Sequence, residues 1–198
     1  MEGVQKCLVL FFFIFSLTSS EIIKINDGFL QGTNKTSLKG VHFDAFMKIP
    51  YAEPPTNSLR FQPPVKKTPW EGTWIATEFG PMCMQTGSGT WPMSEDCLHL
   101  NVFTKNLNQT ILKPVLVYIH GGAFETGSAH NHGPEYFMDR DVVLVTINYR
   151  LNKFGFLASG TSKAMGNMGL KDQAMALKWV RDNIHVFGGD AQRVTISG

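Results

Sequence analysis

The glycine pair that follows residues 115–119 is the part of this sequence best suited to chemistry. Residues 120–124 read His-Gly-Gly-Ala-Phe, and the run before them is apolar and β-branched, as in a buried strand. Small residues directly after a strand let the backbone turn sharply and let a ligand approach its N–H groups. A glycine turn without a function would look the same, so both interpretations stay open at this point.

Two other short patterns carry no comparable signal. The Gly87-Ser88-Gly89 segment has no adjoining lysine and lacks phosphate-loop spacing, so we expect a flexible loop. His130 and His132 form the only close histidine pair, and we expect them in a solvated loop. The sequence therefore predicts no metal site.

The composition is that of an ordinary globular protein. Of the 198 residues, 43% are hydrophobic and 17% are charged, which allows a sizeable core and argues against intrinsic disorder. Lysine and arginine total 18 against 16 for aspartate and glutamate, a net charge of +2. Nucleic-acid-binding proteins normally show a basic patch or stripe, so we expect no nucleic-acid partner.

The first residues differ from the rest of the chain. Lys6 precedes an almost wholly apolar run over residues 7–17, and the small residues 18–20 lead to Glu21. This order predicts a secretory signal peptide over residues 1–20. A membrane-spanning helix would need about 20 apolar residues, and no later stretch is long and apolar enough. We therefore expect a secreted protein without a stable membrane anchor.

Secretion affects the interpretation of the cysteines and of two sequons. Cys7 lies in the predicted signal peptide, which leaves Cys83 and Cys97. In an oxidising compartment these favour one disulfide over a zinc site, because no His-x-x-x-His or Cys-x-x-Cys pattern accompanies them. Asn34 and Asn108 each begin an Asn-x-Thr sequon and are candidate glycosylation sites.

The elements that must position the loop can be predicted from hydrophobic patterns. Residues 21–49 are β-rich, and the Asp-Gly pair at 27–28 between apolar runs predicts a hairpin. Residues 50–74 hold two proline pairs, which cannot sit inside a helix or a central strand. We expect coil there.

From residue 98 onward, strand and helix patterns alternate. Residues 98–103 alternate apolar and polar side chains, which predicts a half-buried strand. The runs 115–119 and 142–147 are apolar throughout and predict strands buried on both faces, with helices on either side. Residues 193–197 begin another strand after a glycine pair. This order of elements predicts an α/β sheet.

The helix between the last two strands is predicted over residues 169–184. The apolar side chains that fall on one face at helical spacing are Leu170, Ala174, Leu177, Val180 and Ile184. The charged side chains that we expect in solvent are Lys171, Asp172, Lys178 and Asp182.

Six blocks of this sequence, taken together, resemble the N-terminal part of type-B carboxylesterases, the family that includes cholinesterases and insect juvenile hormone esterases. The blocks are residues 46–55 with 59–61, 94–102, 120–124, 148–150, 166–173, and 187–190 with 194–196. They follow the family's order, and the resemblance covers residues 21–198. It implies the N-terminal part of an α/β-hydrolase fold, with an incomplete central sheet and flanking helices.

The resemblance implies ester hydrolysis through a Ser-Glu-His triad and a covalent acyl-enzyme. A small-molecule carboxylic ester would be the substrate, and no cofactor is expected. The backbone N–H groups that hold the tetrahedral oxyanion fall on Gly122 and Ala123. Family members often have glycine at position 123, but alanine keeps the N–H donor. His120 precedes these donors and is not the triad base.

The resemblance also assigns structural residues. Cys83 and Cys97 match a disulfide that closes a loop at the rim of the active-site gorge. The ion pairs of the family fall on four residues, Arg60 with Glu95 and Arg150 with Asp172. Separate solvated side chains are the alternative for any such pair, and a buried pair would stiffen the scaffold rather than catalyse.

Two further residues depart from the family's arrangement. Trp91 lies in the loop that the cysteines would close, where cholinesterases present a tryptophan to choline. It stands close before Cys97, unlike their tryptophan, so we expect a core or rim residue. His99 stands where the family usually has tyrosine, and we expect an ordinary strand residue.

The triad itself would lie beyond Gly198. In the family, the strand at 194–197 leads into a Gly-x-Ser-x-Gly elbow, and Gly198 matches its first glycine. We therefore expect this stretch alone to be inactive. A non-catalytic adhesion or binding protein, like the neuroligins, remains the alternative function. The oxyanion loop favours the esterase, because a binding module does not need such donors.

Overall fold

The computed structural model describes residues 21–87, 91–107, 110–131 and 133–198. The predictions that lie outside the described residues concern the signal peptide (1–20), Ser88 and Gly89 of the glycine-rich segment, Asn108 and His132.

The chain alternates strands with a few helices. The strands are β1 (Ile22–Ile25), β2 (Gly28–Gln31), β3 (Thr33–Thr36), β4 (His42–Pro50), β5 (Thr73–Ile75), β6 (Met82–Cys83), β7 (Met93–Ser94), β8 (His99–Thr104), β9 (Lys113–Ile119), β10 (Val143–Ile147), β11 (Ala158–Thr161), β12 (Ala164–Met165) and β13 (Gly189–Ser197). The α-helices are α1 (Asn152–Phe156) and α2 (Met168–Asn183), and the 3-10 helices are η1 (Asn57–Leu59), η2 (Phe137–Asp139) and η3 (Ile184–Phe187).

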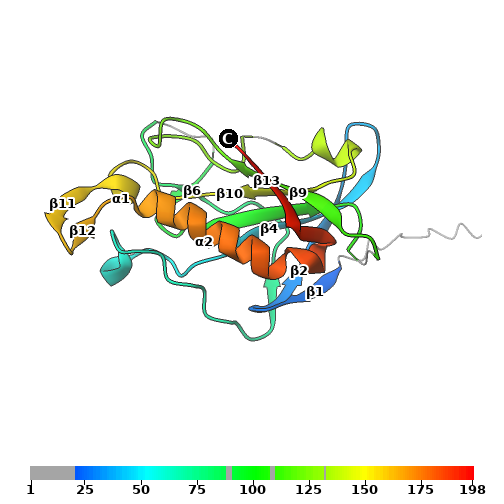
Figure 1. Cartoon of the computed structure of the whole chain (residues 1–198), viewed down its shortest axis with the longest axis horizontal. Coiled ribbons are helices and arrows are strands. Elements are labelled where there is room, and N and C mark those ends of the chain that lie inside the picture. The colour runs from blue at the N-terminus through cyan, green and yellow to red at the C-terminus, as the bar shows by residue number, and fades with distance from the viewer. Residues whose placement is uncertain (1–20, 88–90, 108–109, 132) are drawn as a thin grey trace, which may run out of the picture.

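Six of these strands form the main sheet, in the order β13-β9-β10-β8-β4-β3. β13, β9 and β10 are parallel, whereas β10, β8, β4 and β3 pair antiparallel. Figure 1 shows α2 lying across one face of the sheet, with residue 198 at the tip of β13. The carboxyl ends of β9 and β13 meet at one edge, because Ser197 pairs with Tyr118. The predicted α/β class is confirmed, and the arrangement is compatible with part of an α/β-hydrolase fold.

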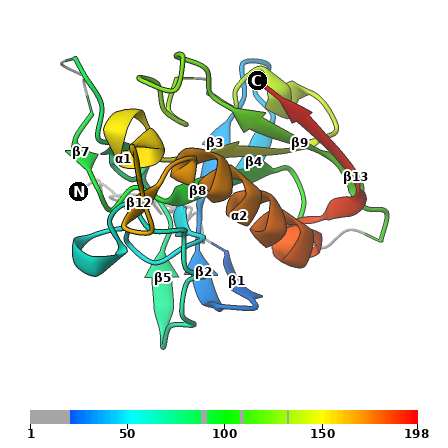
Figure 2. The same ribbon diagram turned by 60° about the vertical axis from the view of Figure 1, so that its left-hand side comes forward.

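The hairpin predicted at residues 27–28 is present. β1 and β2 pair antiparallel, and β5 adds to β2, so that a small second sheet lies below α2 in Figure 2. Asn26 in the turn donates from its backbone N to Asn183 Oδ1 (3.1 Å) and from its side chain to Asp182 O (3.0 Å). The hairpin therefore supplies partners for the C-terminal end of the helix, where backbone carbonyls lack intrahelical donors.

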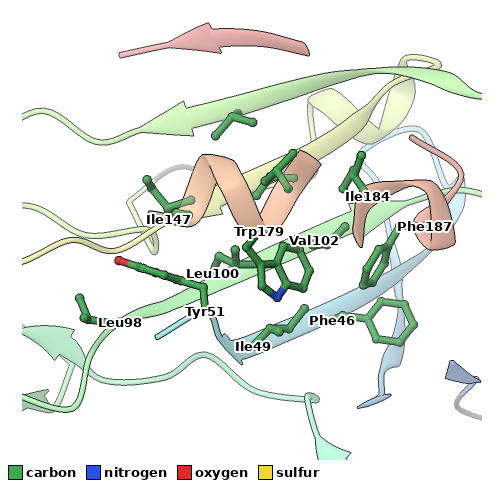
Figure 3. Close-up of a cluster of buried hydrophobic side chains, with 14 of the residues drawn as sticks. Phe46, Ile49, Tyr51, Leu98, Leu100, Val102, Ile147, Trp179, Ile184 and Phe187 are labelled. Carbon is green, nitrogen blue, oxygen red and sulfur yellow. The ribbon is translucent and has the colours of Figure 1, made fainter. Parts of the chain in front are cut away.

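The larger hydrophobic core lies between α2 and the main sheet. Trp179 from α2 and Phe187 from η3 pack with Phe46 and Leu100 from neighbouring strands (Figure 3). The rings of Phe46 and Phe187 meet edge to face, with centroids 5.3 Å apart. These four side chains are almost fully buried. Their contact fixes the helix on the sheet.

The opposite face of the sheet has a smaller core. Phe43 and Met47 of β4, Phe103 of β8 and Leu144 of β10 pack there against Met138 of η2. Among the described residues, this short 3-10 helix takes the place of the α-helix that we expected on that side. The prediction of α-helices on both faces therefore holds for one face.

The strand predicted at residues 98–103 is present, but the prediction of half burial is wrong. All six side chains of β8 are buried. Asn101 accepts a hydrogen bond from the backbone N of Lys48 (3.0 Å) and donates one to Thr146 Oγ1 (2.9 Å). Lys48 lies at an irregularity of β4, with φ 59°. The polar positions of β8 thus mark internal hydrogen bonding rather than contact with solvent.

The predicted helix is present, but its buried face is partly different. Val180 and Ile184 are buried as expected, whereas Leu170 is 45% exposed and Ala174 is exposed. The side chain of Asp172, expected in solvent, is fully buried. The buried residues of α2 are Met168, Gly169, Asp172, Ala176, Trp179, Val180 and Asn183.

Contact with Arg150 explains why Asp172 faces inward. Arg150 donates to Asp172 Oδ2 from its backbone N (3.0 Å) and its Nε (2.8 Å), and to Oδ1 from its Nη2 (2.8 Å). Both residues are at most 3% exposed. Gly169 allows this close approach, since a Cβ there would lie 2.4 Å from Arg150 O. A buried bidentate ion pair therefore holds the first turn of α2 against the residues after β10.

Replacing Asp172 by asparagine should destabilise the protein by about 3–5 kcal/mol, because the buried Arg150 charge loses its counterion and meets an amide NH₂. Chemical denaturation of the purified protein measures the free energy of unfolding. Asp182→Asn is the matched control, since its partner Arg181 is 64% exposed. That change should cost less than about 1 kcal/mol. Equal costs for the two variants would contradict the assignment.

Candidate functional site

The loop after β9 is a tight turn with left-handed backbone. φ is 118° at Gly122, 55° at Ala123 and 61° at Phe124. The carbonyl of Gly122 accepts hydrogen bonds from the backbone N of Glu125 (3.0 Å) and of Thr126 (3.1 Å), which close the turn. A Cβ at Gly122 would lie 2.1 Å from Thr126 O, so only glycine fits there. Ala123 keeps its N–H donor but adopts a conformation that costs an alanine about 1–2 kcal/mol.

The backbone N–H groups of Gly122 and Ala123 are open. Neither donates a hydrogen bond to another residue in the described part of the chain. Both residues are exposed. Backbone donors of this kind bond to water or to a ligand oxygen. Two neighbouring donors suit an oxygen on which negative charge develops.

Two hollows meet at this loop. The larger, of about 560 Å³, is lined by Gly122, and the smaller, of about 310 Å³, is lined by Ala123. His120 and Gly121 line both. Gly198, which follows β13, lines the smaller one beside Ala123. The open N–H groups therefore lie where the carboxyl ends of two parallel strands meet, which is where α/β sheets place their ligands.

The segment after β10 anchors both ends of the turn. The imidazole of His120 is buried and stacks on Tyr149, with ring centroids 4.4 Å apart. Tyr149 also donates from its hydroxyl to His120 O (2.7 Å). At the other end, Phe124 O accepts from the backbone N of Asn152 (2.7 Å). The turn is thereby held in place by residues that lie distant in the sequence.

Asn148 joins several loops behind the turn. Its side chain accepts from the backbone N of Ala129 (2.9 Å) and donates to Pro81 O (3.1 Å). Its backbone N donates to His99 O (3.0 Å), and its carbonyl accepts from the buried Tyr51 hydroxyl (2.7 Å). Because Asn148 makes these contacts while buried, it fixes the positions of the segments at Pro81, His99 and Ala129 relative to one another.

A disulfide loop borders the larger hollow. Cys83 and Cys97 are bonded, with an S–S distance of 2.05 Å, which confirms the predicted pairing. The described residues contain no group of three or more His, Cys, Asp or Glu that could hold a metal ion. Trp91 lines the hollow, is 45% exposed, and stacks on His130 at 4.9 Å between ring centroids. It is a rim tryptophan, one of the two positions that we expected.

Comparison with known proteins identifies relatives of this chain. The model of the carboxylesterase family matches residues 19–198. The chain belongs to the carboxylesterase family. A carboxylic ester hydrolase of Bombus ignitus is 43% identical over an alignment of 207 positions. The alignment covers 99% of this chain and 37% of that protein.

Two juvenile hormone esterases are also similar. Those of Heliothis virescens and Tribolium castaneum are 39% and 44% identical, over 90% and 91% of this chain. The alignments cover 34% and 32% of these two proteins. The chain thus spans about a third of the length of the curated relatives that it matches.

Within this carboxylesterase-family chain, both expected ion pairs are in contact. Arg60 donates from Nε and Nη2 to the two carboxylate oxygens of Glu95, at 2.5 and 2.6 Å. This pair is partly exposed, with 40% and 22% of the side chains accessible, whereas Arg150 and Asp172 are buried. Neither pair lines the hollows at the turn. Their position fits a role in the scaffold.

Burial disfavours the charged form of two histidines, the buried His99 and the half-buried His130. Burial, with a smaller effect from Lys48, lowers the pKa of His99 from 6.5 to about 4. His99 Nε2 lies 3.8 Å from Asp96. His130 contacts Gly80 O through Nε2 (2.8 Å), and burial lowers the pKa of its imidazole as well. Removal of each ring from water favours its uncharged form.

Sequence reasoning missed one residue at this site. The side chain of Gln85 contacts the end of the turn, yet a glutamine two positions after a cysteine carries no distinctive pattern. Tyr149 and Asn148 were noticed only as part of a block that resembles the family.

In the described ranges, no helix is long and apolar enough to cross a membrane.

His99 should make the protein less stable as the pH falls from about 6.5 toward about 4. In this window the unfolded chain binds a proton at position 99 and the native protein does not. The free energy of unfolding, measured at about pH 7 and about pH 5, should fall less steeply in His99→Gln than in the wild type. Asn57→Gln, which changes no ionisable side chain, should keep the wild-type slope. An unchanged slope in His99→Gln would refute the assignment.

Proposed function

We propose that residues 21–198 are the N-terminal part of a secreted serine carboxylesterase with an α/β-hydrolase fold. The observation that carries this proposal is the pair of open N–H groups at Gly122 and Ala123 beside the two hollows. Membership of the carboxylesterase family supports it further. The activity belongs to the whole protein, because the proposed triad lies outside these residues.

In the proposed reaction, this segment stabilises the oxyanion. A serine attacks the ester carbonyl, and the carbonyl oxygen acquires negative charge in the tetrahedral intermediate. Gly122 and Ala123 donate to that oxygen from groups that are already oriented, so no reorganisation is needed during the reaction. In a comparable hydrolase, each such donor lowers the barrier by about 2.7–4 kcal/mol.

The proposed nucleophile follows Gly198. That residue lines the smaller hollow beside Ala123, and it matches the first glycine of the family's Gly-x-Ser-x-Gly elbow. A serine two positions farther would enter the same region as the open N–H groups. The glutamate and histidine of the triad would come later in the chain and complete proton transfer.

Small carboxylic esters are the proposed substrates. The larger hollow, about 560 Å³, falls in the size range of pockets for small molecules. Three relatives carry names that describe ester hydrolysis, and two of them are named for juvenile hormone. We propose neither a metal ion nor a cofactor, because the serine mechanism uses protein groups only. No nucleic acid and no membrane anchor are part of the proposal.

The ester-hydrolase proposal is tested with the whole protein and a chromogenic acetate ester. Gly122→Ala should lower kcat/KM by at least about 100-fold, because the added Cβ would strike Thr126 O and displace both donors. Gly40→Ala is the control. It imposes a left-handed conformation on alanine in the same way (φ 80°), but its Cβ meets no atom within 4 Å, and activity should stay at the wild-type level. Absence of hydrolysis by the wild type would refute the function.

The secretion proposal rests on the predicted signal peptide and on the two sequons. Asn34 is exposed on the edge strand β3. Expression in insect cells should release a protein whose mature chain begins at Glu21 and carries glycans. Asn34→Gln should remove one of two glycan mass increments, whereas Asn57→Gln, which alters no sequon, should remove none. Retention of the protein in the cytosol, or an unmodified mass, would contradict the proposal.

A further inference from the structure

The side chain of Gln85 joins the disulfide loop to the end of the oxyanion turn. Gln85 Oε1 accepts from the backbone N of Gly127 (2.8 Å), and Gln85 Nε2 donates to Gly127 O (2.8 Å). The same amide nitrogen also donates to Cys83 O (3.1 Å). Both ends of the amide therefore have partners, and its orientation is fixed by three hydrogen bonds.

Gly127 in turn lies directly against the peptide that precedes Gly122. A Cβ at Gly127 would stand 2.4 Å from Gly121 O and 2.4 Å from His120 Nδ1. His120 Nδ1 itself lies 3.0 Å from Gly121 O. The carbonyl of Gly121 is therefore confined between the ring of His120 and the backbone of Gly127.

The orientation of this carbonyl decides where the Gly122 donor points. Gly121 O and Gly122 N–H belong to one planar trans peptide, so they point in opposite directions. Holding the oxygen against Gly127 aims the N–H away from Gly127. The next donor, on Ala123, shares a peptide with Gly122 O, which Thr126 N holds at 3.1 Å.

We infer that Gln85 is a positioning residue for the oxyanion donors, acting through Gly127 and Gly121. The inference rests on the proposed esterase function and adds to it a residue that makes no bond to the reacting oxygen. Gln85 is half-buried and lines the larger hollow, but its amide groups are already bonded to the protein. Loss of these bonds should therefore weaken transition-state stabilisation rather than substrate binding.

Two substitutions in the whole protein test this role. Gln85→Glu keeps the shape of the side chain but places a carboxylate oxygen against the carbonyls of Gly127 and Cys83. Gln85→Met keeps the approximate volume and removes all three hydrogen bonds without adding charge. Gln62→Glu is the matched control, because Gln62 Nε2 also donates to a backbone carbonyl, that of Lys163 (2.9 Å), away from the turn.

The measurements are kcat and KM for a chromogenic acetate ester, and the affinity for a trifluoromethyl ketone, which forms a tetrahedral adduct with a serine nucleophile. Burst titration gives the concentration of active sites, so unfolded enzyme does not enter kcat. In both Gln85 variants we expect kcat to fall by about 10- to 100-fold, with KM within about threefold of the wild type. Affinity for the ketone should fall by the same factor as kcat/KM, and Gln62→Glu should match the wild type.

Results that contradict the role of Gln85 can be told apart from a result that contradicts the esterase function. If the wild type is active and both Gln85 variants keep kcat within about twofold, the positioning role is overturned and the esterase function stands. If KM rises while kcat is unchanged, Gln85 is a substrate contact and the inference fails. If the wild type hydrolyses no ester and forms no adduct with the ketone, the proposed function fails and this inference falls with it.

Discussion

The buried ion pair between Arg150 and Asp172 is the interaction on which the arrangement of the site depends. It places the first turn of α2 directly on the segment that follows β10, and Gly169 approaches Arg150 O closely enough to exclude a Cβ. A desolvated charge pair tolerates little displacement, because separating the charges leaves each of them buried and uncompensated. Tyr149 is the neighbouring residue in the chain, so its position is set by the same contact.

From that fixed segment, the turn that carries Gly122 and Ala123 is held at several points. Tyr149 supports His120, the backbone N of Asn152 binds Phe124 O, and Gln85 binds Gly127. These contacts oppose the conformational cost of two successive non-glycine residues in the left-handed region, Ala123 among them. Strain of about 1–3 kcal/mol per residue persists only where the surroundings over-determine the conformation, and such strain is concentrated at functional sites.

Local signals in the sequence were enough to predict the elements but not their environment. The Asp-Gly hairpin and the apolar run of β10 are read from adjacent residues, and both were predicted correctly. Burial is decided by partners elsewhere in the chain. Asp172 faces inward because it bonds to Arg150, which lies 22 positions away in the sequence. Asn101 is buried because its amide donates to Thr146 and accepts from the backbone N of Lys48, at the irregularity of β4. Neither partner is visible in a helical or alternating pattern.

The same distinction applies to the candidate site. The turn was found because its small residues follow a strand, but Gln85 was not, since Gly127 lies 42 positions away in the sequence. Backbone N–H donors place few demands on the side chains of their own residues, which is why alanine can stand at position 123. The demands fall instead on residues that fix the peptide planes. In the proposed esterase, the orientation of the two donors therefore depends largely on residues that make no bond to the reacting oxygen.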